Sequence, residues 1–161
     1  MSGINYDLKR IRAFAFDVDG VLSASSIPLH PSGEPMRVIN IKDGYAMQLA
    51  VKLGYDVAII TGGRTEAVRK RFEGLGVKDL YLGAAVKISV YDEWLAKRGL
   101  KDEEVAFMGD DIPDMEVFGL CGVSVTVGDA PDYVKAKADL VLESFGGQGA
   151  FRELVEHIIN I

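Results

Sequence analysis

Short apolar runs alternate with longer segments of helical spacing along most of this chain. The apolar runs are Ala13–Phe16, Val57–Ile60, Leu80–Leu82, Val105–Met108, Val123–Val127 and Leu140–Leu142. The segments with helical spacing are Tyr45–Leu53, Glu66–Glu73, Ile88–Lys97, Met115–Phe118, Tyr133–Ala136 and Ala150–Ile159. Apolar runs without alternation are typical of strands buried on both faces. The order of the elements therefore predicts an α/β fold, a doubly wound and mostly parallel sheet with helices on both faces.

Glycines mark three of the expected helix ends. Gly54, Gly74 and Gly99 lie where helix C-termini are predicted. The chain contains no internal repeat, low-complexity tract or linker, so we expect residues 1–161 to form a single domain.

The segment 21–42, VLSASSIPLHPSGEPMRVINIK, interrupts the alternation of strands and helices. Pro31, Ser32, Gly33 and Pro35 mark a turn between two extended arms. We predict a β-hairpin flap that projects over the strand ends, because long loops in compact domains are commonly functional. An ordinary surface loop is the alternative.

Composition narrows the class of protein. The 161 residues are 48% hydrophobic, and the formal net charge of −6 argues against nucleic acid as the main partner. Cys121 is the only cysteine, which excludes an intrachain disulfide and predicts a buried filler in a reducing compartment. No apolar run approaches the ~18 residues of a membrane span, and the first ten residues do not resemble a signal peptide. We therefore expect a cytoplasmic protein.

Two carboxylates stand at the end of the first apolar run. Asp17 and Asp19 follow this run, and Gly20 follows them. Like charges at the end of a buried strand are unfavourable unless something binds them, and a divalent cation removes this cost. Ligands of open α/β sheets bind at the carboxyl ends of strands. One carboxylate is a candidate nucleophile and the other a candidate acid/base, with an Asp-Gly turn as the alternative.

Two further places offer partners for an anion. Thr61, Gly62, Gly63 and Arg64 join a predicted strand to a helix, so a hydroxyl, backbone N–H groups and a guanidinium form a candidate anion site. Lys87 lies near a helix start, where the helix dipole disfavours a cation, so we expect it to face an anion. A glycine-rich turn and a surface lysine are the alternatives.

Acidic residues also follow the run Val105–Met108. Asp110, Asp111 and Asp114 lie within five positions and repel one another unless a cation is present. Oxygen ligands suit Mg²⁺, although an acidic turn beside a helix start is the alternative. Nearly all these groups follow predicted strands, so we expect them to share one sheet edge, an arrangement that suits phosphoryl transfer.

The ordered motifs resemble those of the haloacid dehalogenase-like (HAD) phosphohydrolase superfamily. The matching residues are DVDGV at 17–21, Thr61, Lys87 and GDDIPD at 109–114. Segments at 39–49, 60–72, 79–87, 108–117 and 146–155 extend the likeness to the capless branch. That branch contains phosphatases of 3-deoxy-D-manno-octulosonate (KDO) 8-phosphate. The resemblance implies a Rossmann-like fold without a cap domain.

The resemblance also implies roles for individual residues. Asp17 is the expected nucleophile and Asp19 the acid/base, while Asp17, Asp110 and the carbonyl of Asp19 are the expected Mg²⁺ ligands. Thr61 and Lys87 would hold phosphoryl oxygens, and Asp111 and Asp114 would support the metal or the substrate. The expected substrate-binding residues are Asn40, Lys42, Asp43, Gly44, Gly62, Asp111, Arg64 and Arg71, of which either arginine would pair with a sugar carboxylate. For Asp43, the residues alone predict a helix N-cap.

A function follows from this resemblance as an expectation. It implies a Mg²⁺-dependent phosphatase that converts KDO 8-phosphate to KDO through an aspartyl phosphate, for lipopolysaccharide precursor synthesis. It also implies a homotetramer in which the flap of one subunit covers the site of another. The composition predicts no nucleic acid or membrane partner. A phosphatase for a nine-carbon sialic-acid-like 9-phosphate and a non-catalytic oligomerisation module remain as alternatives. A P-loop kinase is disfavoured because its glycine-rich motif is absent.

Three features depart from the family pattern. Val86 stands where many members have an acidic or polar residue, and Arg64 follows two glycines where members commonly have one. The second departure weakens the assignment of Arg64. The chain stops 12 residues after Gly149, where members often continue into a tail that reaches a neighbouring site, so we expect weaker closure or altered product release.

Overall fold

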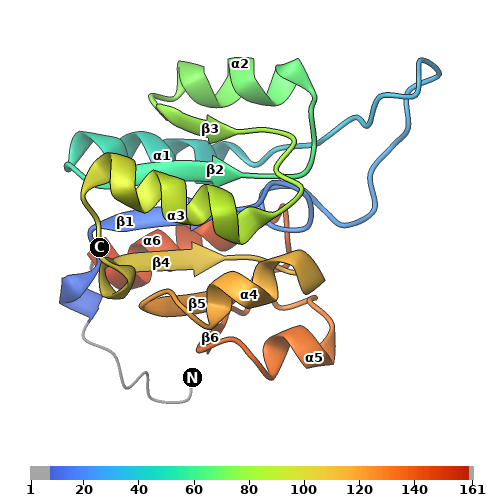
Figure 1. The fold of residues 1–161 in the computed structure, drawn as a ribbon. Helices are drawn as coiled ribbons and strands as arrows, with labels where there is room; N and C mark the ends of the chain where they lie inside the picture. Colours follow the sequence, from blue (N-terminus) through green and yellow to red (C-terminus); the bar gives the residue numbers. More distant parts are fainter. Residues whose placement is uncertain (1–7, 160–161) are drawn as a thin grey trace.

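A six-stranded parallel sheet forms the centre of the protein, whose computed structural model describes residues 8–159. The strands are β1 (Ala13–Phe16), β2 (Asp56–Ile60), β3 (Asp79–Tyr81), β4 (Val105–Met108), β5 (Val123–Thr126) and β6 (Leu140–Val141). Their order is β3-β2-β1-β4-β5-β6, and every neighbouring pair is parallel (Figure 1). This arrangement confirms the predicted doubly wound α/β fold.

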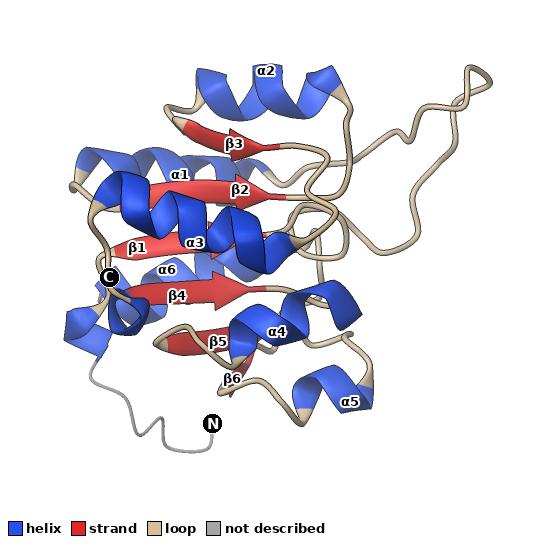
Figure 2. Ribbon diagram, viewed as in Figure 1, coloured by secondary structure: helices blue, strands red, loops and turns tan. Residues whose placement is uncertain are grey.

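Helices cover both faces of the sheet (Figure 2). They are α1 (Ile41–Lys52), α2 (Glu66–Gly74), α3 (Lys87–Arg98), α4 (Met115–Phe118), α5 (Asp132–Lys135) and α6 (Ala150–Ile159). Short 3-10 turns span Leu8–Arg10, Asp102–Glu104 and Ile112–Asp114. Helices α1 and α6 lie on one face and α3 and α4 on the other. Within residues 8–159, no helix has the length and apolar character needed to cross a membrane.

Aromatic side chains fill the core on both faces of the central strands. On one face, Phe151 of α6 packs against Phe14 and Phe16, with ring centroids 5.6 and 4.5 Å apart. On the other face, the ring of Phe107 contacts Tyr91 of α3 and Phe118 of α4. Burial on both faces explains why these strands are continuous apolar runs rather than alternating ones.

Two helix ends differ from the sequence prediction. Helix α1 begins at Ile41 rather than Tyr45, because the side chain of Asn40 accepts hydrogen bonds from the backbone N–H groups of Lys42 and Asp43. Asn40 therefore takes the N-cap position that we predicted for Asp43. Gly74 is the last residue of α2, and the left-handed turn after this helix falls on Gly76, at φ 95°. Gly99 does cap α3 in the left-handed conformation, as predicted.

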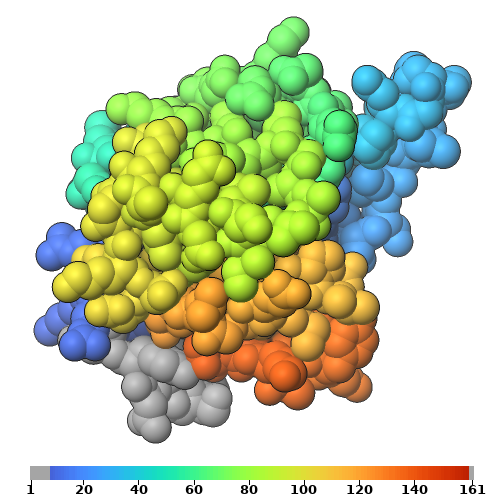
Figure 3. All heavy atoms as spheres, viewed as in Figure 1, coloured from blue at the N-terminus to red at the C-terminus, as the bar shows by residue number. Residues whose placement is uncertain are grey.

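The segment after β1 forms a buried turn followed by a projecting arm. Val21, Leu22 and Ser23 are buried, and Gly147 donates a backbone hydrogen bond to the Val21 carbonyl. Residues 24–40, here called the flap, then leave the body and return at α1 (Figure 3). Only the tip is paired as a hairpin, through an antiparallel bridge between Leu29 and Pro35. The predicted range 21–42 thus starts inside the body and ends within a helix.

Candidate active site

The acidic motifs meet at the carboxyl edge of the sheet. Strands β1 and β4 are neighbours, and Phe16 is in register with Met108, so Asp17 and, one residue further along its strand, Asp110 emerge at the same edge. This is also where the strand order reverses direction, the usual ligand position in such sheets. A pocket of about 470 Å³ opens there. Its lining includes the predicted residues Asp17, Asp19, Thr61, Gly62, Lys87, Asp110 and Asp111.

A buried lysine joins two of the carboxylates. Lys87 is the first residue of α3, and its Nζ lies 2.8 Å from Asp17 Oδ2 and 2.7 Å from Asp114 Oδ1. Burial alone would lower the pKa of Lys87, but the two carboxylates outweigh it and raise that pKa above its ordinary value. The ammonium therefore stays charged despite the unfavourable helix dipole.

A cluster of carboxylates surrounds this lysine. One oxygen each from Asp17, Asp110 and Asp114 lie within 4.8 Å of one another. Both oxygens of Asp114 are engaged, because Oδ1 binds Lys87 and Oδ2 accepts from the backbone N–H groups of Asp110 and Asp111. Asp114 therefore fixes the position of Lys87 and of the backbone at Asp110 and Asp111.

Lys87 does not balance all the negative charge of the cluster, and this excess favours the binding of a cation. Oδ1 of Asp110 is buried without a hydrogen-bond partner, and burial together with the nearby charges of Asp17 and Asp114 raises the pKa of Asp110 to about 8. Burial also raises the pKa of Asp17, against the opposing effect of Lys87. An unpaired carboxylate oxygen beside a second carboxylate is the ligand set that a hard divalent ion prefers. Asp17 and Asp110 fit Mg²⁺ on these grounds.

Two glycines make room for this arrangement. Gly20 has φ 84°, and a Cβ placed on it would overlap the carboxylate of Asp110. A Cβ on Gly109 would likewise overlap the side chain of Asp114. Our sequence analysis assigned no role to either glycine, although both lie inside the motifs. Any larger residue would displace a carboxylate of the cluster.

Thr61 forms the opposite wall of the pocket. Its side chain is buried, and Oγ1 accepts a hydrogen bond of 3.3 Å from the backbone N–H of Gly63. Its backbone N–H donates to Tyr81, and its carbonyl accepts from Ala84, which fixes the loop after β2 to the loop after β3. The Thr61 hydroxyl and the glycine backbone that follows it thus line the pocket, groups of the kind that anion sites use.

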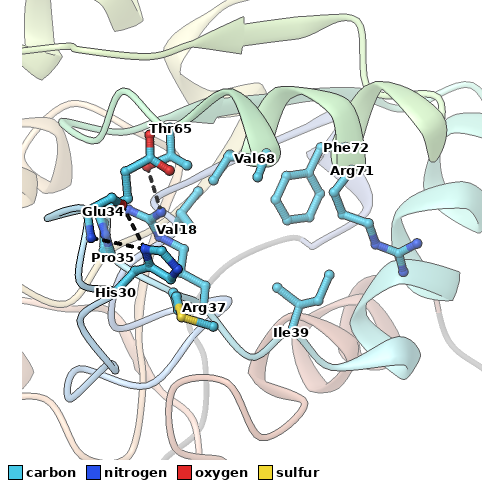
Figure 4. Close-up of a pocket in the computed structure, with 13 residues that line it drawn as sticks. Val18, His30, Glu34, Pro35, Arg37, Ile39, Thr65, Val68, Arg71 and Phe72 are labelled. Atoms are coloured by element: carbon cyan, nitrogen blue, oxygen red, sulfur yellow. Dashed lines mark hydrogen bonds between the residues drawn. The ribbon is translucent and has the colours of Figure 1, made fainter.

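The other predicted substrate-binding residues lie outside this pocket. Asp43 is buried, its Oδ1 accepts from the backbone N–H of Arg152 at the start of α6, and burial raises its pKa to about 6. Arg64 is exposed and lies against Gly83, and Arg71 lines a second pocket beside the flap (Figure 4). The pocket with Asp17 is not lined by Asn40, Lys42, Asp43, Gly44, Arg64 or Arg71. Their binding of a sugar stays a prediction.

One charged contact of the site was missed by our sequence analysis. Arg37 of the flap donates from Nε to Asp19 Oδ1 at 2.7 Å and from Nη2 to Asp19 Oδ2 at 3.0 Å. Its Nη1 donates to Thr65 Oγ1 at the start of α2. The contact with Asp19 raises the pKa of Arg37 further. The available signal was that Arg37 is the only lysine or arginine between Asp17 and Lys42.

The raised pKa of Asp110 predicts how stability depends on pH without a divalent ion. The folded protein holds a proton that the unfolded chain releases between about pH 4 and pH 8, so the stability from this group is lost as the pH rises through that window. We therefore expect the free energy of unfolding of Asp110→Asn, measured by urea titration in chelator, to exceed that of the wild type increasingly toward pH 8.

The effect of Mg²⁺ on the unfolding of the same two proteins is the second measurement. Added Mg²⁺ should raise the unfolding midpoint of the wild type most at the upper end of this window, and Asp110→Asn should lose most of that response. Parallel pH curves for the two proteins, with equal responses to Mg²⁺, would contradict this account of the cluster.

Comparison with known proteins identifies the superfamily that the sequence motifs resemble. Residues 79–154 match the family described as haloacid dehalogenase-like hydrolase. The chain is 34% identical to the KDO 8-phosphate phosphatase of Haemophilus influenzae over 153 residues, which cover 95% of this chain and 85% of that enzyme.

Solved structures agree with this match. The crystal structure of KDO 8-phosphate phosphatase from Yersinia pestis superposes with a TM-score of 0.92 at 38% identity, covering 95% of this chain and 83% of that one. The enzyme from Moraxella catarrhalis, in complex with a magnesium ion, a phosphate ion and a KDO molecule, gives a TM-score of 0.90 at 31% identity, covering 95% and 88%. With this likeness in sequence and fold over nearly its whole length, the chain belongs to the KDO 8-phosphate phosphatase family of haloacid dehalogenase-like hydrolases.

Proposed function

We propose that this protein hydrolyses the phosphate monoester of KDO 8-phosphate, releasing KDO and inorganic phosphate with the help of Mg²⁺. The observation that carries the proposal is the pocket in which Asp17, Asp110 and the buried Lys87 face Thr61. The related enzymes named for this reaction support the substrate, and the magnesium, phosphate and KDO bound to the Moraxella enzyme support the ligand set.

The reaction consists of two successive displacements at phosphorus, in which Asp17 and Asp19 have different roles. In the first, an oxygen of Asp17 bonds to phosphorus as the bond to the sugar oxygen breaks, and Asp19 gives that oxygen a proton. In the second, Asp19 takes a proton from a water molecule that attacks phosphorus, and the bond from phosphorus to Asp17 breaks. The products are the free sugar and inorganic phosphate, and both aspartates return to their starting state.

Positive charge and fixed donors stabilise the phosphoryl group during both steps. Lys87 is held beside Asp17 by Asp114, so its ammonium is already in place when the phosphoryl group arrives. Thr61 presents its hydroxyl from a loop fixed by backbone hydrogen bonds. Asp17, Asp110 and the backbone carbonyl of Asp19 would hold Mg²⁺, which when bound supplies charge to offset that on the phosphoryl oxygens. Asp111 would support this group from the rim.

The alternatives are less well supported. A phosphatase for a nine-carbon sugar acid needs the same motifs, but the related enzymes that match most of this chain are named for the eight-carbon substrate. A non-catalytic module would not need a buried, unpartnered carboxylate oxygen beside a buried lysine.

The test is phosphate release from purified protein. We expect Mg²⁺-dependent hydrolysis of KDO 8-phosphate with a higher kcat/KM than for a nine-carbon sugar-acid 9-phosphate, and loss of activity in chelator. Asp17→Asn should lower kcat on the order of 10³-fold or more, because it removes the attacking oxygen. Asp92→Asn on the exposed side of α3 makes the same change in charge and should leave kcat unaltered.

Two results would reject the proposal. Near-normal turnover by a folded Asp17→Asn protein would remove Asp17 from the reaction. Absence of phosphate release from every acidic sugar phosphate, with Mg²⁺ present, would favour the non-catalytic module.

We also propose that one catalytic domain, with residues 24–40 as its flap, assembles into a cytoplasmic homotetramer. The flap and the following helix start expose Leu29, Met36, Val38, Ile41 and Tyr45, a run of apolar side chains suited to burial against another subunit. A single cysteine fits a reducing compartment. Analytical ultracentrifugation should show a tetramer that Val38→Glu weakens, whereas a monomeric wild type would contradict the assembly.

A further inference from the structure

The side chain of the proposed acid/base, Asp19, is bound chiefly by Arg37 of the flap. Asp19 Oδ1 accepts from Arg37 Nε and, at 3.3 Å, from the hydroxyl of Ser23, while Asp19 Oδ2 accepts from Arg37 Nη2. In the proposed reaction, Asp19 must present an oxygen to the leaving group of the substrate. Here two guanidinium donors and the Ser23 hydroxyl take three of the four lone pairs of the Asp19 carboxylate and hold it toward the flap. Opening the ion pair with Arg37 would free Asp19 to turn toward the leaving oxygen.

Arg37 stands between two hollows of the protein. On one side lies the pocket lined by Asp17, Asp19 and Gly63. On the other side lies a pocket of about 400 Å³ between the flap and α2, where Arg37 and Ile39 face Val68 and Phe72 (Figure 4).

The guanidinium connects residues of these two hollows, because Arg37 lines the second pocket and binds Asp19 of the first. It also lies against the loop after β2, since a Cβ on Gly63 would come within 2.9 Å of Arg37 Nη2.

An incoming carboxylate can replace the one that Arg37 now holds. A guanidinium binds two carboxylate oxygens through two parallel N–H donors, and exchanging one carboxylate for another keeps both hydrogen bonds. A sugar acid brings such a group in addition to its phosphate. A neutral sugar phosphate brings only the phosphoryl group, which Lys87 and Thr61 are placed to hold.

We propose that Arg37 is a positioning and specificity-determining residue that holds Asp19 toward the flap until the carboxylate of an acidic sugar phosphate takes over its guanidinium. The exchange frees the Asp19 carboxylate, which then takes a proton from solvent and faces the leaving oxygen that receives it, so an acidic substrate prepares the site for its own hydrolysis. This inference rests on the proposed function, because it takes an acidic sugar phosphate as the substrate.

Steady-state kinetics on two substrates test the exchange. KDO 8-phosphate carries the carboxylate, and glucose 6-phosphate is a neutral sugar with the same phosphate group. Arg37→Gln should lower kcat/KM for KDO 8-phosphate roughly 10- to 100-fold, mainly through KM, because a charge-assisted two-point contact is lost. For glucose 6-phosphate, kcat should stay within about two-fold of the wild type or rise, because Asp19 is no longer held away.

Two further variants separate positioning from folding. Arg37→Lys keeps the charge but cannot make the two-point contact, so it should restore part of the preference for KDO 8-phosphate. Arg69→Gln removes a guanidinium that pairs with Glu66 and Glu73 on the surface of α2, and should leave both substrates unaffected.

The outcomes distinguish this inference from the proposed function. A wild type that does not prefer KDO 8-phosphate contradicts the proposed function. A wild type with that preference, retained in full by Arg37→Gln, contradicts the role of Arg37 alone. Equal losses on both substrates in Arg37→Gln and Arg37→Lys would show that Arg37 serves the phosphoryl group or the fold, and would overturn the exchange.

Discussion

The charge balance around Lys87 is the constraint on which the rest of this site depends. One buried ammonium touches the carboxylates of Asp17 and Asp114, and a third carboxylate, that of Asp110, lies beside them with an unpartnered oxygen. Burying this much negative charge is costly, and the raised pKa of Asp110 expresses that cost. A divalent cation removes it, and a phosphoryl group then meets a site whose positive charges are already fixed.

The fold supplies the positions that this charge cluster needs. Strands β1 and β4 pair in register, so their carboxyl ends lie side by side. Lys87, the first residue of α3, reaches the same point from the helical layer that covers the sheet. The turn at Ile112–Asp114 directs Asp114 back toward the N–H groups of Asp110 and Asp111. Gly20 and Gly109 leave the space into which the carboxylates fit. Each of these features is local, yet together they fix three acids around one lysine.

The features of the fold and the site that could be predicted from sequence are those that neighbouring residues in the chain determine. Asp17 and Asp110 could be placed because each follows an apolar run that had to be a buried strand, and parallel strands end at one edge. The N-cap was assigned to Asp43 instead of Asn40, because both residue types cap helices and only the folded chain shows that Asp43 binds the start of α6. Arg37 was missed because its partner lies 18 positions away, across a turn without regular periodicity, and its isolation as the only lysine or arginine between Asp17 and Lys42 does not identify that partner.

The central claim is that Asp17 becomes covalently phosphorylated during turnover. The most direct measurement is acid quenching of the protein during hydrolysis of KDO 8-phosphate, followed by borohydride reduction and mass spectrometry of the tryptic peptide 13–37. Reduction converts an aspartyl phosphate to homoserine, so we predict homoserine at position 17 and unchanged aspartate at position 19. Turnover that leaves both residues unmodified, or that modifies Asp19 instead, would contradict the account.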